Sequence, residues 1–375
     1  MSHSLSIQSH FSVLPDPRIN RRRRHKLLDI LVIALCAALC GIDDWAGVEL
    51  FGQLKEDWFR TFLELPGGIP SHDTFGRVFS RLDPKAFEAC FRSWIAALAE
   101  AATEGVVAID GKSLRGSFDT ASGKSPLHMV SAFSASSGLC LGQVATDEKS
   151  NEITAIPVLL KTLDLKGCIV TIDAMGCQKE IARQIVADAK ADFVLALKGN
   201  QGSTHQDVRD YFEAPNAPWK DTPHSVFEET DKGHGRIEIR KVIVTDDLGW
   251  LTQRKEWSGL TSIALVESTR IIGEKETTER RYYLSSLPAD AARIGRAVRQ
   301  HWGIENRLHW CLDVTYNEDA SRIRKDHGPQ NMTVLRRLAV NLLRQIELGP
   351  KKVSLRGRLI MANHNSAFML KALGF

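Results

Sequence analysis

VVAIDGKSLR, residues 106–115, begins with a short apolar run and meets an acidic side chain at Asp110. An apolar run of this length next to glycine is typical of a central strand that is buried on both faces. CIVTID, residues 168–173, repeats the pattern and ends at Asp173. Acids at the carboxyl ends of buried strands occupy the edge where α/β sheets place their chemistry. The two stretches therefore predict two strands that each end in an acid, and the two acids are expected to serve the same site.

The segments around these two strands predict the sheet order. Residues 128–147 split into two extended runs around Ser136, Ser137 and Gly138, which is a hairpin signal, so three antiparallel strands are expected. A helix then leads to the strand that ends at Asp173. Residues 176–191 have the pattern of a crossover helix before another strand, which makes a parallel βαβ unit. This order predicts an α/β fold, a ribonuclease H-like mixed sheet with flanking helices.

The composition of the remaining segments predicts the domain organisation. The N-terminal part has apolar residues at helical spacing, and a later segment is rich in short strands separated by Gly, Lys and Glu turns. The expected organisation is an all-α N-terminal domain (1–100), the first part of the core (101–213), a β-rich insertion (214–288), the final core helices with Glu305 (289–348) and a basic C-terminal tail (349–375).

Composition limits the class of protein. The chain has 375 residues, of which 43% are hydrophobic, so a large buried core is expected and a disordered chain is excluded. The net charge of +4 suits a nucleic-acid partner but is shared by many enzymes. The seven cysteines form no CxxC pair and lie mostly in apolar stretches. They are expected to be reduced core residues of a cytoplasmic protein.

The basic run RRRRHK, residues 21–26, precedes an apolar segment and so resembles the start of a signal peptide. That apolar segment is shorter than the roughly 20 residues of a membrane span. It is also interrupted by Asp29 and preceded by a long polar leader. A buried helix with a basic entry is therefore expected, with no membrane partner. Arg22, Arg23 and Arg24 are then free to meet DNA phosphates.

Three carboxylates suit metal-dependent phosphoryl transfer. Mg²⁺ prefers oxygen ligands, and a pair of such ions can activate a hydroxyl and stabilise a leaving oxygen at phosphorus. Asp110 is expected to bridge two Mg²⁺ ions, Asp173 to hold one and Glu305 the other, with Mn²⁺ as a substitute. One alternative is a zinc hydrolase, because His301, Glu305, His309 and Asp313 are spaced by four residues and would share a helix face.

Longer motifs carry a resemblance that spans nearly the whole chain. They are DPRINRRRRHKLLDIL, LPGGIPSHDTFGRVFSRLDP, AIDGKSLRGS, HMVSAF, DEKSNEITAIPVLL, TIDAMGCQKEIA, LALKGNQ, GHGRIEIR, YYLSSL and HWGIENRLHWCLDVTYNEDASR. With these motifs the chain resembles the H-repeat-associated, ISAs-type insertion-sequence transposases of the DDE superfamily, whose core is ribonuclease H-like. The resemblance implies a catalytic triad of Asp110, Asp173 and Glu305 in a DNA transposase of a bacterial insertion sequence.

The resemblance also implies the reaction and the partners. Water would attack each end of the element, and the freed 3′-hydroxyl would then attack target DNA. The partners would be double-stranded DNA, as terminal inverted repeats and as target, and a second copy of the chain in a homodimer or larger complex. The chain departs from broader relatives, which carry Tyr, Arg and Lys where this sequence has Val298, His301 and Leu312. Basic contacts near Glu305 must therefore come from other residues.

Further basic side chains near the predicted acids are candidates for DNA contact, because Lys and Arg contacts to phosphate dominate DNA affinity. They are Lys112, Arg115, Lys198, His301 and Arg307. A structural salt bridge to neighbouring acids is the alternative for Lys112 and Arg115. Two other functions stay open at this point: an inactive or domesticated copy that binds DNA without cleavage, and a nuclease without strand transfer.

Overall fold

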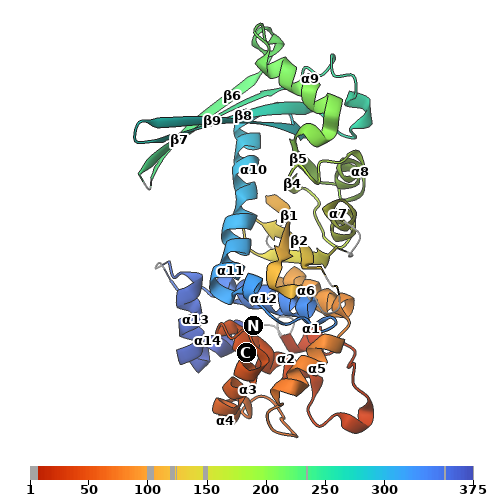
Figure 1. Cartoon of the computed structure of the whole chain (residues 1–375), viewed down its shortest axis with the longest axis vertical. Coiled ribbons are helices and arrows are strands. Elements are labelled where there is room, and N and C mark those ends of the chain that lie inside the picture. Colours follow the sequence, from red (N-terminus) through yellow and green to blue (C-terminus); the bar gives the residue numbers. More distant parts are fainter. Residues whose placement is uncertain are drawn as a thin grey trace.

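The structure is a computed structural model that describes residues 7–98, 105–118, 123, 125–146, 151–233, 235–349 and 352–374, without the side chain of Arg22. The predicted boundary between residues 100 and 101 lies outside the described residues, as do residues 147–150 of the DEKSNEITAIPVLL motif. The chain is elongated (Figure 1), with the helices of both termini at one end and a β-rich arm at the other.

Within the described residues, nine strands form one mixed sheet in the order β3-β2-β1-β4-β5-β9-β8-β7-β6. The strands are β1 (Val106–Leu114), β2 (Leu127–Ser134), β3 (Cys140–Ala145), β4 (Ile169–Ile172), β5 (Asp192–Leu197), β6 (Ser225–Gly233), β7 (Arg236–Thr245), β8 (Ser262–Ile272) and β9 (Lys275–Ser285). The antiparallel meander of β1 to β3 and the parallel pair of β4 and β5 are both confirmed. The chain is therefore a mixed α/β protein.

The β-rich segment extends this sheet. Strands β6 to β9 are antiparallel, and β9 pairs with β5 over Val194 to Leu197. The sequence predicts an inserted antiparallel sheet but does not reveal this junction. Without β9 the edge of β5 would expose unpaired backbone groups, which sheets generally cover. The far ends of β6 to β9 project beyond the helices as the arm seen in Figure 1.

Strand β1 is longer than the sequence predicts. It continues past Asp110 to Leu114 because β2 pairs with it from Val107 to Leu114. Its parallel pairing with β4 is shorter and ends at Ile109. Asp110 is therefore inside a strand, which corrects the expected strand end, but it is the first residue beyond the parallel part of the sheet.

Side chains that alternate along the strands pack under helices on both faces. Val107 and Ile109 share a core with α7 (Glu152–Leu160), α8 (Lys179–Arg183) and α9 (Gly202–Glu213). On the opposite face, Val106 packs with α10 (Ala291–Gly303). Because successive strand residues face opposite sides, Ala108 and Asp110 lie on the α10 face.

The helices of the two chain ends share one hydrophobic core. The N-terminal helices are α1 (Ile7–Phe11), α2 (Leu27–Leu39), α3 (Trp45–Leu54), α4 (Glu56–Phe59), α5 (His72–Arg81) and α6 (Pro84–Leu98), and the C-terminal ones are α11 (Trp310–Tyr316), α12 (Gly328–Gln345), α13 (Leu355–His364) and α14 (Ser366–Leu373). Helix α12 packs against α2, α5 and α6. No helix of the described residues is both long and apolar enough to cross a membrane. All seven cysteines are unpaired, and all but Cys311 are buried.

Candidate active site

Strand register brings the two predicted aspartates together. The parallel pairing of β1 with β4 ends at Ile109 opposite Ile172, and Asp110 and Asp173 are the next residue of each strand segment. Side chains alternate, so both acids follow Ala108 and Thr171 onto the α10 face. The Asp173 carboxylate accepts backbone hydrogen bonds from Met175 at 3.0 Å and Gly176 at 3.4 Å, which fix the turn after β4.

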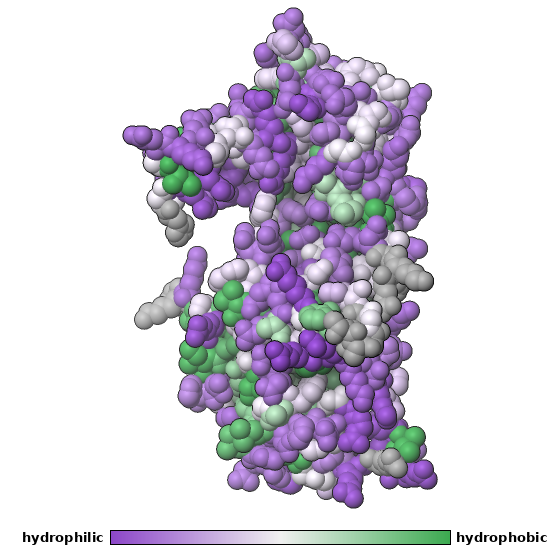
Figure 2. Space-filling model, viewed as in Figure 1, coloured by the Kyte–Doolittle hydropathy of each residue, from purple (hydrophilic) through white to green (hydrophobic). Residues whose placement is uncertain are grey.

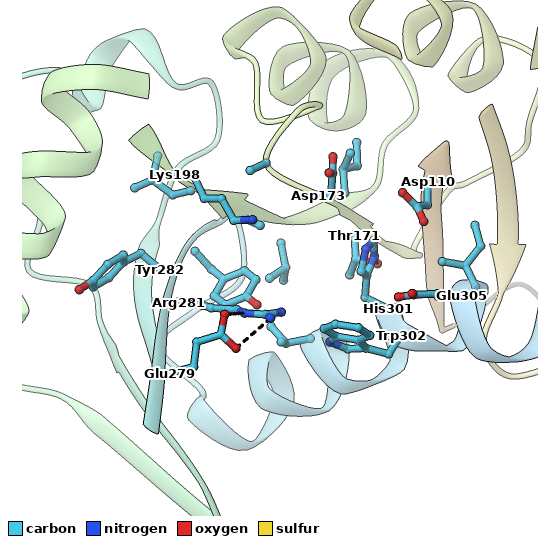
Figure 3. Close-up of a pocket in the computed structure, with 18 of the residues that line it drawn as sticks. Asp110, Thr171, Asp173, Lys198, Glu279, Arg281, Tyr282, His301, Trp302 and Glu305 are labelled. Atoms are coloured by element: carbon cyan, nitrogen blue, oxygen red, sulfur yellow. Dashed lines mark hydrogen bonds and ion pairs between the residues drawn. The ribbon is translucent and has the colours of Figure 1, made fainter. Parts of the chain in front are cut away.

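Helix α10 and the segment that continues it bring Glu305 to the same place. Asp290 caps α10 by accepting a hydrogen bond from the Arg293 backbone at 2.9 Å. The helix widens into a π-helical segment, Ile304–His309, before α11. Figure 3 shows Glu305 and His301 on this helix, facing Asp110 and Asp173. A pocket of about 340 Å³, called the acidic pocket below, is lined by all three acids together with Lys198, Arg281, His301 and Trp302.

The carboxylates of the acidic pocket repel one another. Burial, followed by the negative charges of Asp173 and Glu152, raises the pKa of Asp110 to about 7. Burial and the charge of Glu152 also raise the pKa of Asp173, against backbone hydrogen bonds and Lys198, which lower it. A raised carboxyl pKa means that the ionised form is costly without a compensating cation. The three carboxylates are hard oxygen donors, so their chemistry fits a divalent metal ion.

Two histidines border the acids, the half-buried His301 and the buried His309. His301 Nδ1 is 2.9 Å from the Thr171 hydroxyl, and His309 Nδ1 is 3.6 Å from an oxygen of Asp110. Burial lowers the pKa of His301 to about 4 and that of His309 to about 3, so both rings are neutral at physiological pH. No group of three or more His, Cys, Asp or Glu side chains within the described residues is arranged as a preformed metal site. Three of the side chains spaced by four residues instead contact the sheet separately. His301 contacts Thr171, His309 contacts Asp110 and Asp313 contacts Lys112.

Lys112 forms structural salt bridges between β1 and the segment around α11. Its ammonium lies 2.7 Å from the Asp313 carboxylate and 3.1 Å from that of Asp319, and its side chain is only 8% exposed. These contacts are the structural salt bridge that the sequence offers as the alternative to DNA contact for Lys112. Arg115 is 3.6 Å from Asp319, but its side chain is 86% exposed and can still reach another anion. Lys112 therefore holds α11 and the following turn against β1.

The other predicted basic residues are distributed over three regions. Lys198 follows β5 and lines the acidic pocket. Arg307 packs over the Phe133 ring and donates a hydrogen bond to the Ala135 carbonyl at 2.8 Å. Arg23 donates to the Arg18 carbonyl, and Arg24 is exposed in the N-terminal helical region. The side chain of Arg22 lies outside the described residues. Among the predicted DNA-contact residues whose side chains the structure describes, only Lys198 and His301 line the acidic pocket.

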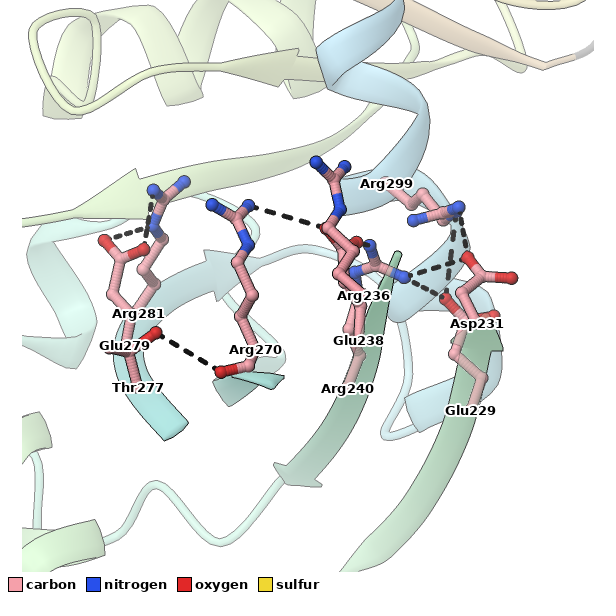
Figure 4. Close-up of polar contacts among 10 residues, drawn as sticks. All are labelled: Glu229, Asp231, Arg236, Glu238, Arg240, Arg270, Thr277, Glu279, Arg281 and Arg299. Atoms are coloured by element: carbon pink, nitrogen blue, oxygen red, sulfur yellow. Dashed lines mark hydrogen bonds and ion pairs between the residues drawn. The ribbon is translucent and has the colours of Figure 1, made fainter. Parts of the chain in front are cut away.

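The arm formed by β6 to β9 carries arginines that are matched by acids (Figure 4). Arg240 pairs with Glu229, Asp231 and Glu238, and Arg299 of α10 reaches Asp231 at 2.5 Å. Figure 2 shows a hollow between this arm and the helices α13 and α14, on a largely hydrophilic face. The ion pairs tie the arm to α10, the helix that leads to Glu305.

Three residues of the site are missed by sequence reasoning. The sequence pattern assigns His309 only to the zinc alternative, and it does not point to His128 or Glu152 as site residues. In the structure His128 Nε2 is 2.8 Å from the Glu152 carboxylate. The signal available was the helix start at Asn151, whose side chain accepts a hydrogen bond from the Ile153 backbone and caps α7. That start places Glu152 in the first turn, facing β1.

Comparison with known protein families fits this geometry. The Transposase DDE domain family matches residues 101–342, which include all three acids of the pocket. The chain belongs to the DDE transposase family. Residues 8–95 of this DDE transposase match the DDE_Tnp_1-associated family, over the N-terminal helices. Transposition is the function that these matches support, and they confirm the predicted family.

Curated relatives agree over most of the chain of this DDE transposase. "Putative transposase YncI" of Escherichia coli O157:H7 is 44% identical over 347 residues, which cover 91% of this chain and 88% of that protein. "H repeat-associated putative transposase YhhI" of Escherichia coli (strain K12) is 40% identical over 342 residues, or 90% of each chain. A cryo-EM structure of the piggyBac transposase synaptic complex with hairpin DNA aligns with 99% of this chain and 78% of that chain. Its TM-score of 0.44 at 11% identity is too low to assign details of the fold.

Proposed function

We propose that this DDE transposase cleaves the ends of a bacterial insertion element and joins the freed 3′-hydroxyl to target DNA by phosphoryl transfer at the acidic pocket. The observation that carries the proposal is the register of β1 and β4, which sets Asp110 and Asp173 side by side, with Glu305 facing them across the pocket. We further propose that the sheet and its helices form a ribonuclease H-like core, and that two copies of the chain or more act together on the two element ends.

Asp110, Asp173 and Glu305 would hold Mg²⁺, or Mn²⁺ in its place. The bound cations would supply Lewis-acid activation of a hydroxyl and stabilisation of the leaving oxygen. The chain itself fixes the acids: the two strands hold the aspartates, and the neutral rings of His301 and His309 pack beside them without adding charge. Binding of a cation would offset the burial and the repulsion by Asp173 and Glu152 that raise the pKa of Asp110.

DNA would be held by basic residues around the pocket and by the N-terminal helices. Lys198, which lines the pocket, would meet a phosphate next to the scissile bond. Arg115 and Arg307, both exposed, and the N-terminal Arg22, Arg23 and Arg24 would meet phosphates further along the duplex. His301 would act through Thr171, because its ring is half-buried and neutral.

The experiment that tests this function uses a supercoiled plasmid that carries the gene with its own flanking DNA. The wild-type chain is incubated with Mg²⁺ or with EDTA, and the Glu305→Gln variant serves as the matched control. Nicking at the element ends that needs Mg²⁺ and Glu305 supports the proposal. Intact binding of the ends without any cleavage would instead indicate a copy that only binds DNA, a function that the family match and the relatives do not favour.

Lys198→Ala is expected to weaken DNA binding about equally for all sequences and to reduce the slope of log affinity against log salt by about 1, because one phosphate contact is lost. Lys112→Met serves as the control. Its ammonium is already neutralised by Asp313 and Asp319, so the salt slope should stay unchanged while the protein becomes less stable. Fluorescence anisotropy at several salt concentrations measures both. A changed slope for Lys112→Met alone would reverse the two assignments.

A further inference from the structure

Gly111 leaves room for a side chain that comes from another element. It follows Asp110 on β1 and faces the opposite side of the sheet, toward α7. A Cβ atom at this position would lie 2.0 Å from Glu152 Oε1 and 2.4 Å from His128 Nε2. Real side chains do not approach so closely, and these atoms are part of a hydrogen-bonded group. Glycine is therefore needed here so that Glu152 can lie against the backbone next to Asp110.

Two strands and a helix hold the Glu152 carboxylate in this place. Glu152 is in the first turn of α7, and its Oε1 is 2.8 Å from Nε2 of His128 on β2. The other ring nitrogen of His128 is 2.7 Å from the Ser113 hydroxyl on β1. The Glu152 side chain is 17% exposed. The Glu152 side chain is thus held in one position by contacts from β1 and β2.

Glu152 brings a further carboxyl group beside the strand acids. Its Oε1 lies against the backbone of Gly111, the residue that follows Asp110. Glu152 approaches β1 from the α7 side, whereas Glu305 approaches from the α10 side. Of the nearby lysines, Lys112 is already paired with two other acids and Lys198 faces the pocket. Four carboxyl groups, those of Asp110, Asp173, Glu152 and Glu305, therefore lie around this part of the sheet.

We propose that Glu152 is a fourth acid of the site, held by His128 across Gly111, and that its charge strengthens binding of the divalent cation by Asp110, Asp173 and Glu305. This inference rests on the proposed function. Glu152 is a positioning residue in this scheme: it acts through the neighbouring acids and the cation, and no contact with DNA is required of it. It also gives a physical reason for the glycine that follows Asp110.

The test measures Mn²⁺ binding to the full-length chain by electron paramagnetic resonance, without DNA. Glu152→Gln keeps the shape and a hydrogen bond to His128 but removes the charge. We expect about tenfold weaker Mn²⁺ binding, as for other residues around a metal site, and an unchanged melting temperature. Glu180→Gln is the control, because Glu180 also lies in the first turn of a helix but pairs with Arg183. It should bind Mn²⁺ like the wild type.

The outcomes separate this inference from the proposed function. If Glu305→Gln weakens Mn²⁺ binding but Glu152→Gln does not, the inference fails and the proposed function stands. If neither variant changes Mn²⁺ binding, the cation site of the proposed function fails as well. Glu152→Asp retains the charge and shortens the side chain, so it should bind Mn²⁺ better than Glu152→Gln. If Glu152→Asp and Glu152→Gln lose Mn²⁺ affinity equally and both have a lower melting temperature, Glu152 has a purely structural role and the inference is overturned.

Discussion

Replacing Asp110 or Asp173 by asparagine is expected to abolish DNA cleavage, with a rate loss on the order of a thousandfold or more, since several kcal/mol of transition-state stabilisation would disappear. Asparagine has nearly the same shape as aspartate but lacks the negative charge. Strand β1, which contains Asp110, and strand β4, which ends just before Asp173, are each paired on both sides, so the backbone should not move. Binding to the element ends should therefore remain.

The measurement is cleavage of the supercoiled plasmid together with a gel-shift assay on the same DNA ends. Asp192→Asn is the matched control, because Asp192 begins β5 and lies at the opposite end of the parallel strands, where it accepts a hydrogen bond from Ser286. This variant should cleave at close to the wild-type rate. Cleavage by Asp110→Asn at the wild-type rate with Mg²⁺ would remove the acidic pocket from the reaction.

The strand acids could be predicted because they depend on local patterns. Apolar runs that end in an acid predicted β1 and β4, and the crossover helix between β4 and β5 predicted that they run parallel. The pattern could not show that β1 continues to Leu114, because that extension depends on pairing with β2. The position of Asp110 beside Asp173 follows from register, a property of two strands together.

The rest of the site depends on contacts between segments that are far apart in the sequence. For Lys112 the sequence left DNA contact and a structural salt bridge both open, because its partners Asp313 and Asp319 follow it by about two hundred residues. Glu152 gave no signal of its own, because its place is set by Gly111 and His128. His309 entered the sequence interpretation only through the zinc alternative, because its contact with Asp110 depends on how the π-helical segment packs against β1. These residues show where local periodicity stops being informative.

Helix α12 joins the terminal helices to the sheet through buried polar groups. Asn331 donates hydrogen bonds to the Phe79 and Leu82 carbonyls, at 2.7 and 3.0 Å. Asn341 is bonded to the backbone of Cys140 at the start of β3. Buried polar groups are costly unless they are satisfied. The geometry of the terminal helices relative to the sheet is therefore specified by pairing as well as by apolar packing.

Glu318→Gln is expected to reduce the free energy of unfolding by about 3 kcal/mol or more, because it leaves buried guanidinium groups without a counter-charge. Arg336 and Arg337 on α12 are 1% and 0% exposed, and Glu318 is fully buried. Its Oε1 is 2.9 Å from Arg337 and 4.0 Å from Arg336. Urea unfolding monitored by circular dichroism gives the change, with an unchanged m-value as the sign that the same surface unfolds.

Glu56→Gln is the control for this stability measurement. Glu56 forms an ion pair with Arg60 one helical turn away, and both side chains are about a third or more exposed. Such surface pairs contribute about 0.5 kcal/mol or less, so the free energy of unfolding should hardly change. If Glu318→Gln were as mild as this control, water or an anion would have to replace the contacts that Glu318 makes with Arg336 and Arg337, and α12 would not depend on Glu318. A large loss for Glu318→Gln alone means that the turn after α11 is locked to α12, which fixes the helix that presents Glu305 and His309 to the sheet.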